Sequence, residues 1–237
     1  MHPLLILYED NHLIAVFKPA GLLVQGDITG DTTLIDIVKN DLKNRYQKPG
    51  QVYLGLVHRL DRVVSGVVIF AKTSKAASRL CEQIRQRQVE KKYMALVKGQ
   101  LQAQEKKLTH WLVYKNEQAM VFNQPTQDAQ EACLYINTLE YSHIPVPHTY
   151  VDIQLITGRK HQIRAQLAAI GYPIMGDNRY GYKTQQLKTP ANNGRIGLVC
   201  YQMTITHPTA KTPLKIQLPD ALIGSSLQEF FKTPAIN

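Results

Sequence analysis

Hydrophobic and polar residues repeat with two different periods along the chain, and these periods predict both strands and helices. Short apolar runs bounded by turns favour strands, whereas apolar residues three and four positions apart favour the buried face of a helix. The expected strands are residues 4–8, 13–17, 53–57, 67–71, 92–97, 151–156 and 198–206, with several more short strands within 108–155. The expected helices are residues 33–42, 74–88, 161–170 and 225–231.

Pairs of strands with helices between them predict an α+β fold, built on a central mixed, mostly antiparallel sheet with flanking helices. The 237 residues are enough for one large domain or two small ones. The sequence contains no internal repeat, low-complexity tract or clear linker. We therefore expect a single domain over residues 1–237.

Positive charge is concentrated in two separate segments of the chain. Residues 72–98 contain eight basic and two acidic side chains, and residues 153–215 contain nine basic and one acidic. Residues 1–71 are neutral and residues 99–152 are net acidic, while the whole chain carries a net charge of +10. Two basic segments separated by an acidic one favour a folded basic face for a polyanion such as nucleic acid over a flexible basic tail. The alternative is an ordinary solvated surface.

Several classes of protein do not fit this sequence. No apolar run approaches the ~18 residues of a membrane span, and the N-terminal apolar stretch has no preceding Lys or Arg, unlike a secretory signal. Cys81, Cys133 and Cys200 are too far apart for a CxxC metal pair or a disulfide framework, and we expect them to be buried thiols. No nucleotide-binding glycine motif is present. We expect a cytoplasmic protein that requires no cofactor.

The segment His58–Gly66 is unusually rich in ionisable groups for its length, and it lies between two expected strands. Its carboxylate, Asp61, stands near Arg59 and Arg62, and nearby guanidinium groups keep a carboxylate ionised. An ionised carboxylate can be a nucleophile, a base or a metal ligand. A metal site is disfavoured, because no second carboxylate lies nearby. The alternative is an Asp that stabilises a turn.

This segment and four others resemble the motifs of RluA-type pseudouridine synthases. The stretch HRLDRVVSGVVIFAKT at 58–73 is similar to the family's HRLDRxTSG motif and the apolar strand after it. The other similarities, in family order, are KPxG at 17–22, K-x-Y-x-A at 91–97, GRxHQIR…GD..YG at 157–181 and R-x-x-L…HP at 195–208. Val64, Lys160, Gln166 and Gln25-Gly26 depart from the usual residues, which leaves the subgroup open.

The resemblance implies an RNA pseudouridine synthase that isomerises specific uridines of tRNA or ribosomal RNA, in a pseudouridine-synthase-like fold with an RNA-binding cleft. The target base would be flipped out of its stack. The implied catalytic residues are Asp61, Tyr93 and Arg164. Asp61 would act either as a nucleophile or by taking a sugar proton. Arg164 would pair with Asp61, and Tyr93 would stack on the uracil ring.

The resemblance also implies how RNA is held. Many relatives carry an N-terminal S4 RNA-binding module, but here the first motif begins at residue 17, so we expect the catalytic domain to bind RNA by itself as a monomer. Arg59 would enter the space left by the flipped base, and His58 would support the loop. Loops 22–32 and 176–195 would read the shape of the RNA. The candidate substrate contacts are Arg59, Arg62, Ile163 and Leu198, and the candidate phosphate contacts are Lys75, Arg79, Arg85, Arg87, Lys91, Arg159, Lys160, Arg179, Lys183 and Arg195.

Two other functions compete with this interpretation. A catalytically inactive RNA-binding protein on the same fold would keep the basic face, although it could lose the catalytic set. A nucleosidase or glycosidase could use Asp61, but such hydrolases usually need a second carboxylate, and the motifs supply none. Release of free base from RNA would distinguish the hydrolase.

Overall fold

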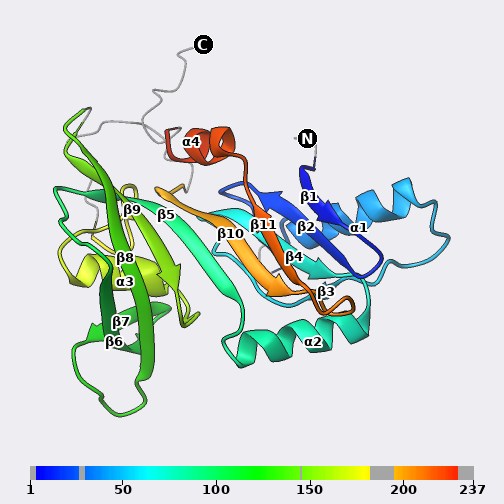
Figure 1. The fold of residues 1–237 in the computed structure, drawn as a ribbon, viewed down its shortest axis with the longest axis horizontal. Coiled ribbons are helices and arrows are strands. Elements are labelled where there is room, and N and C mark those ends of the chain that lie inside the picture. Colours follow the sequence, from blue (N-terminus) through cyan, green and yellow to red (C-terminus); the bar gives the residue numbers. More distant parts are fainter. Residues whose placement is uncertain (1–3, 27–29, 145, 182–194, 229–237) are drawn as a thin grey trace. The chain divides into compact units, whose positions relative to one another are not determined.

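The computed structural model describes residues 4–26, 30–144, 146–181 and 195–228, and these residues belong to two compact units (Figure 1). Unit 1 comprises the chain up to Val89 together with Tyr201–Pro219. Unit 2 comprises Glu90–Cys200 and the chain from Asp220 onward. The expectation of a single domain over 1–237 stays a prediction.

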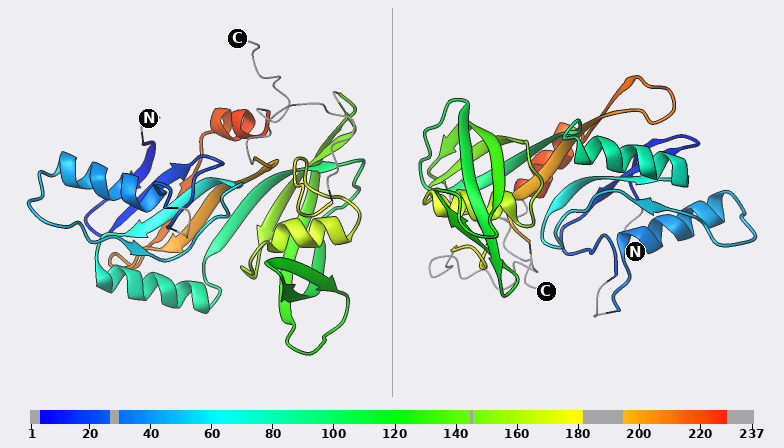
Figure 2. Two further views of the ribbon diagram at one scale, coloured as in Figure 1. Left: turned by 180° about the vertical axis from the view of Figure 1, so that it is seen from behind. Right: turned by 90° about the horizontal axis from the view of Figure 1, so that it is seen from below.

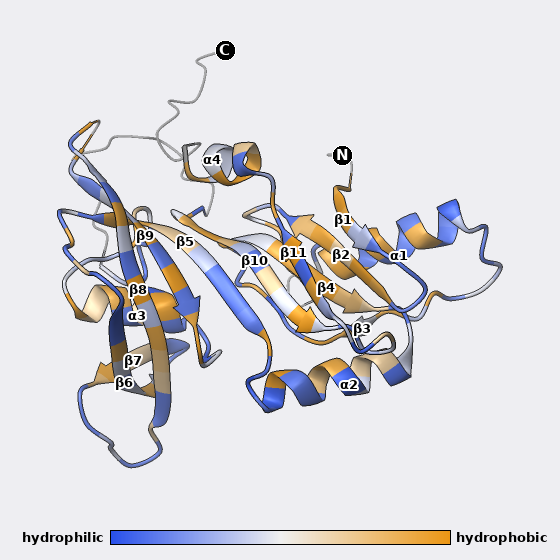
Figure 3. Ribbon diagram, viewed as in Figure 1, coloured by the Kyte–Doolittle hydropathy of each residue, from blue (hydrophilic) through white to orange (hydrophobic). Residues whose placement is uncertain are grey.

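Unit 1 is a sheet in which almost every residue of the two inner strands is buried. Its strand order is β1-β2-β4-β10, with β3 beside β4 and β11 beside β10, and the β1–β2, β2–β4, β3–β4 and β10–β11 pairs are antiparallel. The hydropathy colouring of Figure 3 shows this apolar character along β2 and β4. The strands are β1 (Ile6–Glu9), β2 (Leu13–Lys18), β3 (Gly55–Leu56), β4 (Ser65–Ala71), β10 (Leu198–Thr206), whose last six residues belong here, and β11 (Pro213–Gln217).

Two helices complete unit 1, and their buried residues follow the predicted helical spacing. Helix α1 (Leu34–Arg45) buries Leu34, Val38 and Leu42, while α2 (Ser74–Arg85) buries Ala76 and Leu80. Cys81 on α2 is exposed, so the expectation that all three cysteines are buried was wrong for this one. Its position, one residue after Leu80, turns it about 100° away from the buried stripe.

Unit 2 is an antiparallel sheet that is covered on one face by a short helix. Its strand order is β10-β5-β9-β8-β6-β7, and the four pairs from β5 to β7 are antiparallel. Helix α3 lies across the sheet (Figure 2). The elements are β5 (Glu90–Lys98), β6 (Lys106–Lys115), β7 (Gln118–Phe122), β8 (Gln130–Ser142), β9 (His148–Leu155), the first three residues of β10, α3 (Gln162–Ala169) and α4 (Asp220–Gln228).

The α+β class and the mostly antiparallel sheet are confirmed, but several elements differ from the expectation. The strand expected at 53–57 is the two-residue β3, and the region of several short strands contains the 13-residue β8. The last helix begins at Asp220 and not at 225. Asp220 follows Pro219, and an acidic residue in the first turn complements the partial positive charge of a helix N-terminus. Within the described ranges, no helix is long and apolar enough to cross a membrane.

The start of α1 gives a first testable prediction. The Thr33 hydroxyl accepts a hydrogen bond from the Asp36 backbone N–H, and the Asp36 carboxylate accepts one from the Thr33 backbone N–H, which is a complete capping box. Thr33→Ala removes the hydroxyl, so we expect the free energy of unfolding to fall by about 1 kcal/mol. Urea unfolding measures this change, and an unaltered midpoint would contradict the role of the cap.

Candidate active site

The loop His58–Gly66 connects β3 to β4 and is held by alternating buried and exposed residues. Leu60 and Val64 are buried, whereas Arg59 and Arg62 are exposed and Asp61 is half-buried. The Val64 backbone N–H donates to the Asp61 carbonyl oxygen at 3.1 Å, which closes a turn that begins at Asp61. Val64 stands where the family usually has Thr, and its buried position suits an apolar side chain. Asp61 is thus presented from a loop whose neighbours anchor it.

Lys18, the last residue of β2, supports this loop from inside unit 1. Its side chain is fully buried, and its ammonium donates to the carbonyl oxygens of Pro19 at 3.0 Å, Leu22 at 2.8 Å and Arg62 at 3.2 Å. The Gly21 backbone N–H also donates to the Arg62 carbonyl oxygen, at 2.7 Å. The motif at 17–22 therefore fastens the segment just after Asp61. The sequence motif was recognised, but this role of Lys18 was missed, because its contact with the loop is to Arg62, 44 residues away.

Burial and charge act on Lys18 in opposite directions. Burial lowers the pKa of Lys18 to about 7, the negative charge of Asp61 opposes this shift, and the positive charge of Arg62 adds to it. The charges of Lys18 and Asp61 therefore act on each other within unit 1.

His58 and Arg62 are also tied into the loop. The Ile69 backbone N–H of β4 donates to His58 Nε2 at 3.0 Å, so this nitrogen carries no proton. His58 supports the loop, as expected. Arg62 Nε donates to the Gly21 carbonyl oxygen at 3.0 Å, and its Nη2 pairs with Asp31 at 3.0 Å. The structure thus gives Arg62 a structural task beside its predicted contact with substrate.

Tyr93 of β5 lies on the face of the unit 2 sheet that α3 covers. Tyr93 pairs with Ile153, which pairs in turn with Ile136 of β8. Residues two apart on a strand share a face, so this face also includes Ala132, opposite His110 of β6. His110 Nδ1 is bonded to Gln166 of α3 at 2.9 Å. Tyr93 is 7% exposed, and its side chain is on the same face of the sheet as α3.

The turn before α3 is fastened to β8 by Gln162. Its side-chain oxygen accepts from the Thr157 hydroxyl at 2.8 Å and from the Arg159 backbone N–H at 3.0 Å, and its amide donates to the Cys133 carbonyl oxygen at 3.1 Å. Gln166, where the family commonly has His, bonds to His110, whose pKa is lowered by burial. These contacts set the position of α3 and hence of Arg164.

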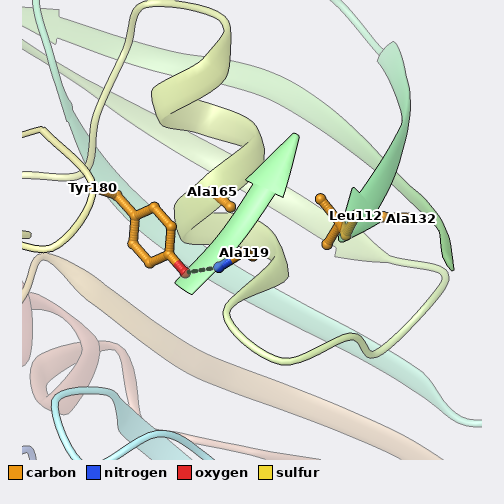
Figure 4. Close-up of a cluster of buried hydrophobic side chains, with 5 residues drawn as sticks. All are labelled: Leu112, Ala119, Ala132, Ala165 and Tyr180. Atoms are coloured by element: carbon orange, nitrogen blue, oxygen red, sulfur yellow. Dashed lines mark hydrogen bonds between the residues drawn. The ribbon is translucent and has the colours of Figure 1, made fainter. Parts of the chain in front are cut away.

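Arg164 is a buried residue of α3 and forms a close ion pair within unit 2. Its Nε donates to Asp177 Oδ2 at 2.6 Å, and its Nη2 donates to Asp177 Oδ1 at 2.9 Å. Its guanidinium carbon lies 5.2 Å from the centre of the Tyr180 ring. Tyr180 packs in a buried cluster with Leu112 and Ala165 (Figure 4). Asp177 was not expected as a partner of Arg164, although it lies in one of the recognised motifs.

Ile163 and Leu198, the remaining candidates of unit 2, are both buried. Ile163 is 5% exposed and Leu198, the first residue of β10, is 3% exposed. The residue before Leu198 is Gly197, where a Cβ atom would lie 2.9 Å from the Leu96 Cβ. This close approach requires glycine at position 197.

The structure therefore distributes the predicted site residues over both units. Asp61, Arg59 and Arg62 belong to unit 1, whereas Tyr93, Ile163, Arg164 and Leu198 belong to unit 2. The expected pairing of Arg164 with Asp61 stays a prediction. Among the described residues, no three His, Cys, Asp or Glu side chains gather as a metal site.

The candidate phosphate contacts differ in how accessible they are. Arg79 donates to the Pro208 carbonyl oxygen at 2.6 Å, so this cation serves the structure of its own unit, while burial lowers the pKa of Lys91. Lys183 and most of the loop 176–195 lie outside the described residues. The exposed candidates are Lys75, Arg85, Arg87, Lys160, Arg179 and Arg195.

Comparisons with known proteins agree with this picture. The family model described as RNA pseudouridylate synthase matches residues 12–169. The chain is 34% identical to tRNA pseudouridine synthase C of Haemophilus influenzae, over 89% of this chain and 90% of that protein. It is also 34% identical to ribosomal large subunit pseudouridine synthase D of Nitrosomonas europaea, over 87% of this chain but 59% of that protein.

A solved structure shares the fold as well. The human RNA pseudouridylate synthase domain containing 4 matches with a TM-score of 0.74 and 25% identity, over 96% of this chain and 93% of that one. The chain therefore belongs to the RNA pseudouridylate synthase family. Its activity is the isomerisation of uridine in RNA to pseudouridine, and the resemblance to RluA-type synthases is confirmed.

The buried ammonium of Lys18 makes the stability of the fold depend on pH. Because its pKa is lowered from 10.5 to about 7, the folded state binds fewer protons than the unfolded state between these values, and its stability rises with pH there. We expect the free energy of unfolding of the wild type, relative to Lys18→Met, to increase from about pH 6.5 to about pH 9. Urea unfolding at both pH values measures this, with Lys48→Met, an exposed lysine, as the control. A constant difference would contradict the burial of a titrating Lys18.

Proposed function

We propose that this enzyme isomerises specific uridines of structured RNA, either tRNA or ribosomal RNA, and that Asp61 is its essential carboxylate. The observation that carries the proposal is the loop around Asp61. The loop is braced by Lys18 and His58, and Asp61 is half-buried between residues anchored in unit 1. A reactive group needs such a rigid support if it is to meet its target in one orientation.

The reaction fits the chemistry of side chains alone. The N–C bond between uracil and ribose breaks, the ring turns, and C5 forms a C–C bond to the same ribose carbon. The proton lost from C5 is balanced by the proton gained at N1, so the change needs no oxidant, reductant or energy source. Asp61 acts as the nucleophile or takes a sugar proton.

Tyr93 and Arg164 serve the same reaction in this proposal. Tyr93 offers an aromatic face to the uracil ring, and such stacking contributes roughly 1–3 kcal/mol per base. Arg164 supplies a positive charge whose place in unit 2 is determined by α3 and Asp177. Leu198 and Ile163 contribute apolar contacts, and Arg59 and Arg62 contribute cations at the surface of unit 1.

The RNA is proposed to bind through the exposed basic residues and to present an unstacked uridine. Single-stranded loops and stem ends are suited to this, because their bases unstack at low cost. The names of similar proteins include both tRNA and ribosomal large subunit synthases. We further propose that the enzyme works in the cytoplasm, where such RNAs are found. The RNA-binding cleft and the monomeric state stay predictions.

Substitution of Asp61 tests the proposed function. We expect Asp61→Asn to reduce pseudouridine formation by at least about 1,000-fold, since the reacting carboxylate is lost while the shape is kept. The assay maps pseudouridines in total RNA from a strain that lacks the gene. Asp41→Asn, on the surface of α1, is a matched control and is expected to convert the same sites as the wild type. Full activity of Asp61→Asn would refute the proposal, and release of free uracil would favour the hydrolase.

The salt dependence of RNA binding tests the basic face. Each phosphate contact that is removed lowers the slope of log affinity against log salt by about 0.7–0.9. We expect Lys75→Ala/Arg87→Ala, which alters two exposed residues of the basic segment 72–98, to lower the slope by about 1–2. Lys43→Ala/Lys48→Ala, in the neutral segment 1–71, is the matched control and is expected to keep the slope. If the slope of log affinity against log salt were the same for both double variants, RNA would not bind at Lys75 and Arg87.

A further inference from the structure

The ion pair between Arg164 and Asp177 is among the most deeply buried charge pairs of unit 2. The Arg164 side chain is 7% exposed and that of Asp177 is 1% exposed. Two hydrogen bonds, from Nε and Nη2 to the two carboxylate oxygens, join the groups side by side. Such a bidentate contact determines both the position of the guanidinium and the orientation of its plane.

Asp177 is itself held rigidly by the turn that follows β9 and α3. Its backbone N–H donates to the Ile174 carbonyl oxygen at 3.1 Å, and its Oδ1 also accepts from the Arg179 backbone N–H at 3.2 Å. The preceding Gly176 has φ +82°, a left-handed conformation that favours glycine. The Met175 backbone N–H donates to the Leu96 carbonyl oxygen at 2.8 Å, which fastens this turn to β5, the strand of Tyr93.

The aromatic ring of Tyr180 also contacts the Arg164 guanidinium. The ring centre lies 5.2 Å from the Arg164 guanidinium carbon, within the range of a cation–π contact. The Tyr180 hydroxyl accepts from the Ala119 backbone N–H at 2.9 Å, as Figure 4 shows, and it lies 3.0 Å from His161 Nδ1. The Arg164 guanidinium is thus hydrogen-bonded to the Asp177 carboxylate and contacts the aromatic ring of Tyr180.

The energetics of buried ion pairs indicate why this pair is present. A buried ion pair is a poor device for stability, because apolar residues of similar volume usually stabilise a fold as well or better. What the pair provides is a cation of defined position and orientation. A guanidinium has five N–H donors, and Asp177 engages two of those of Arg164.

We propose that Asp177 is a positioning residue for Arg164, so that the catalytic rate depends on Asp177 although Asp177 does not itself contact the uridine. The inference rests on the proposed role of Arg164 in the reaction. If Asp177 is removed, Arg164 keeps its charge but loses its orientation. Misplacement of a catalytic group by about 1 Å can cost roughly 100-fold in rate.

The test uses Asp177→Asn and Asp177→Glu in the full chain. Asp177→Asn removes the charge, whereas Asp177→Glu keeps the charge and displaces the carboxylate by one methylene, which retains compensation of the buried guanidinium if the first variant fails to fold. We expect kcat for pseudouridine formation to fall by roughly 10–100-fold in both, with KM for RNA changed by less than about threefold. Asp128→Asn, an exposed aspartate of unit 2, is the matched control and is expected to retain kcat.

A second readout does not depend on activity. In ¹⁵N spectra of the free protein, the Arg164 Nε–H is expected as a resolved, slowly exchanging signal, because it donates to a buried carboxylate. We expect this signal to shift and exchange faster in either variant at Asp177. Wild-type kcat in the variants at Asp177 would overturn the inference, and so would an unchanged Nε–H signal.

The two readouts also separate this inference from the proposed function. If the wild type converts no uridine but its Arg164 signal is protected and responds to Asp177, then the proposed function fails and the positioning contact stands. If the wild type is active and Asp61→Asn is not, but the variants at Asp177 keep wild-type kcat, then the proposed function stands and the positioning role fails.

Discussion

The buried ammonium of Lys18 is the contact on which the loop of Asp61 depends. An ammonium out of water is unfavourable unless acceptors replace its hydration, and here three carbonyl oxygens do so, one of them on Arg62 directly after Asp61. Because these carbonyls come from two segments far apart in sequence, satisfying Lys18 brings the segments together. The hydrogen bonds that compensate the buried Lys18 therefore also shape the loop that carries Asp61.

In unit 2 the buried cation is Arg164, and a carboxylate, not carbonyl oxygens, compensates its charge. Arg164 must be buried in α3 and still keep its charge, and the bidentate contact with Asp177 makes this possible. Gln162 fastens the start of the helix to β8, and Tyr180 links the guanidinium to β7 through Ala119. The side chains of Gln162 and Tyr180 are thus bonded to the backbone of β8 and β7, so the helix cannot shift without breaking several hydrogen bonds.

The patterns along the chain predicted most of the secondary structure, and their failures have local causes. The strand expected at 53–57 shrinks to two residues, although Val52 and Leu54 still bury their side chains on either side of exposed Tyr53. The side chains of residues 52–54 therefore still alternate between buried and exposed, although these residues are not part of a strand. Cys81 is exposed because the helical stripe of α2 is narrow, and an apolar residue beside the stripe need not be covered.

The sequence by itself determined the loop 58–66 with its charged residues, the family, the α+β class and the two basic segments, because these are recorded in local order, spacing and charge. Only the tertiary structure decided what Lys18, Asp177 and Arg79 do. Each of these is a charged residue that a sequence reader assigns to the surface, and each is buried or bonded by partners that are not its neighbours along the chain. The cost of burying a charge is determined by its neighbours in space, and only the folded chain specifies those neighbours.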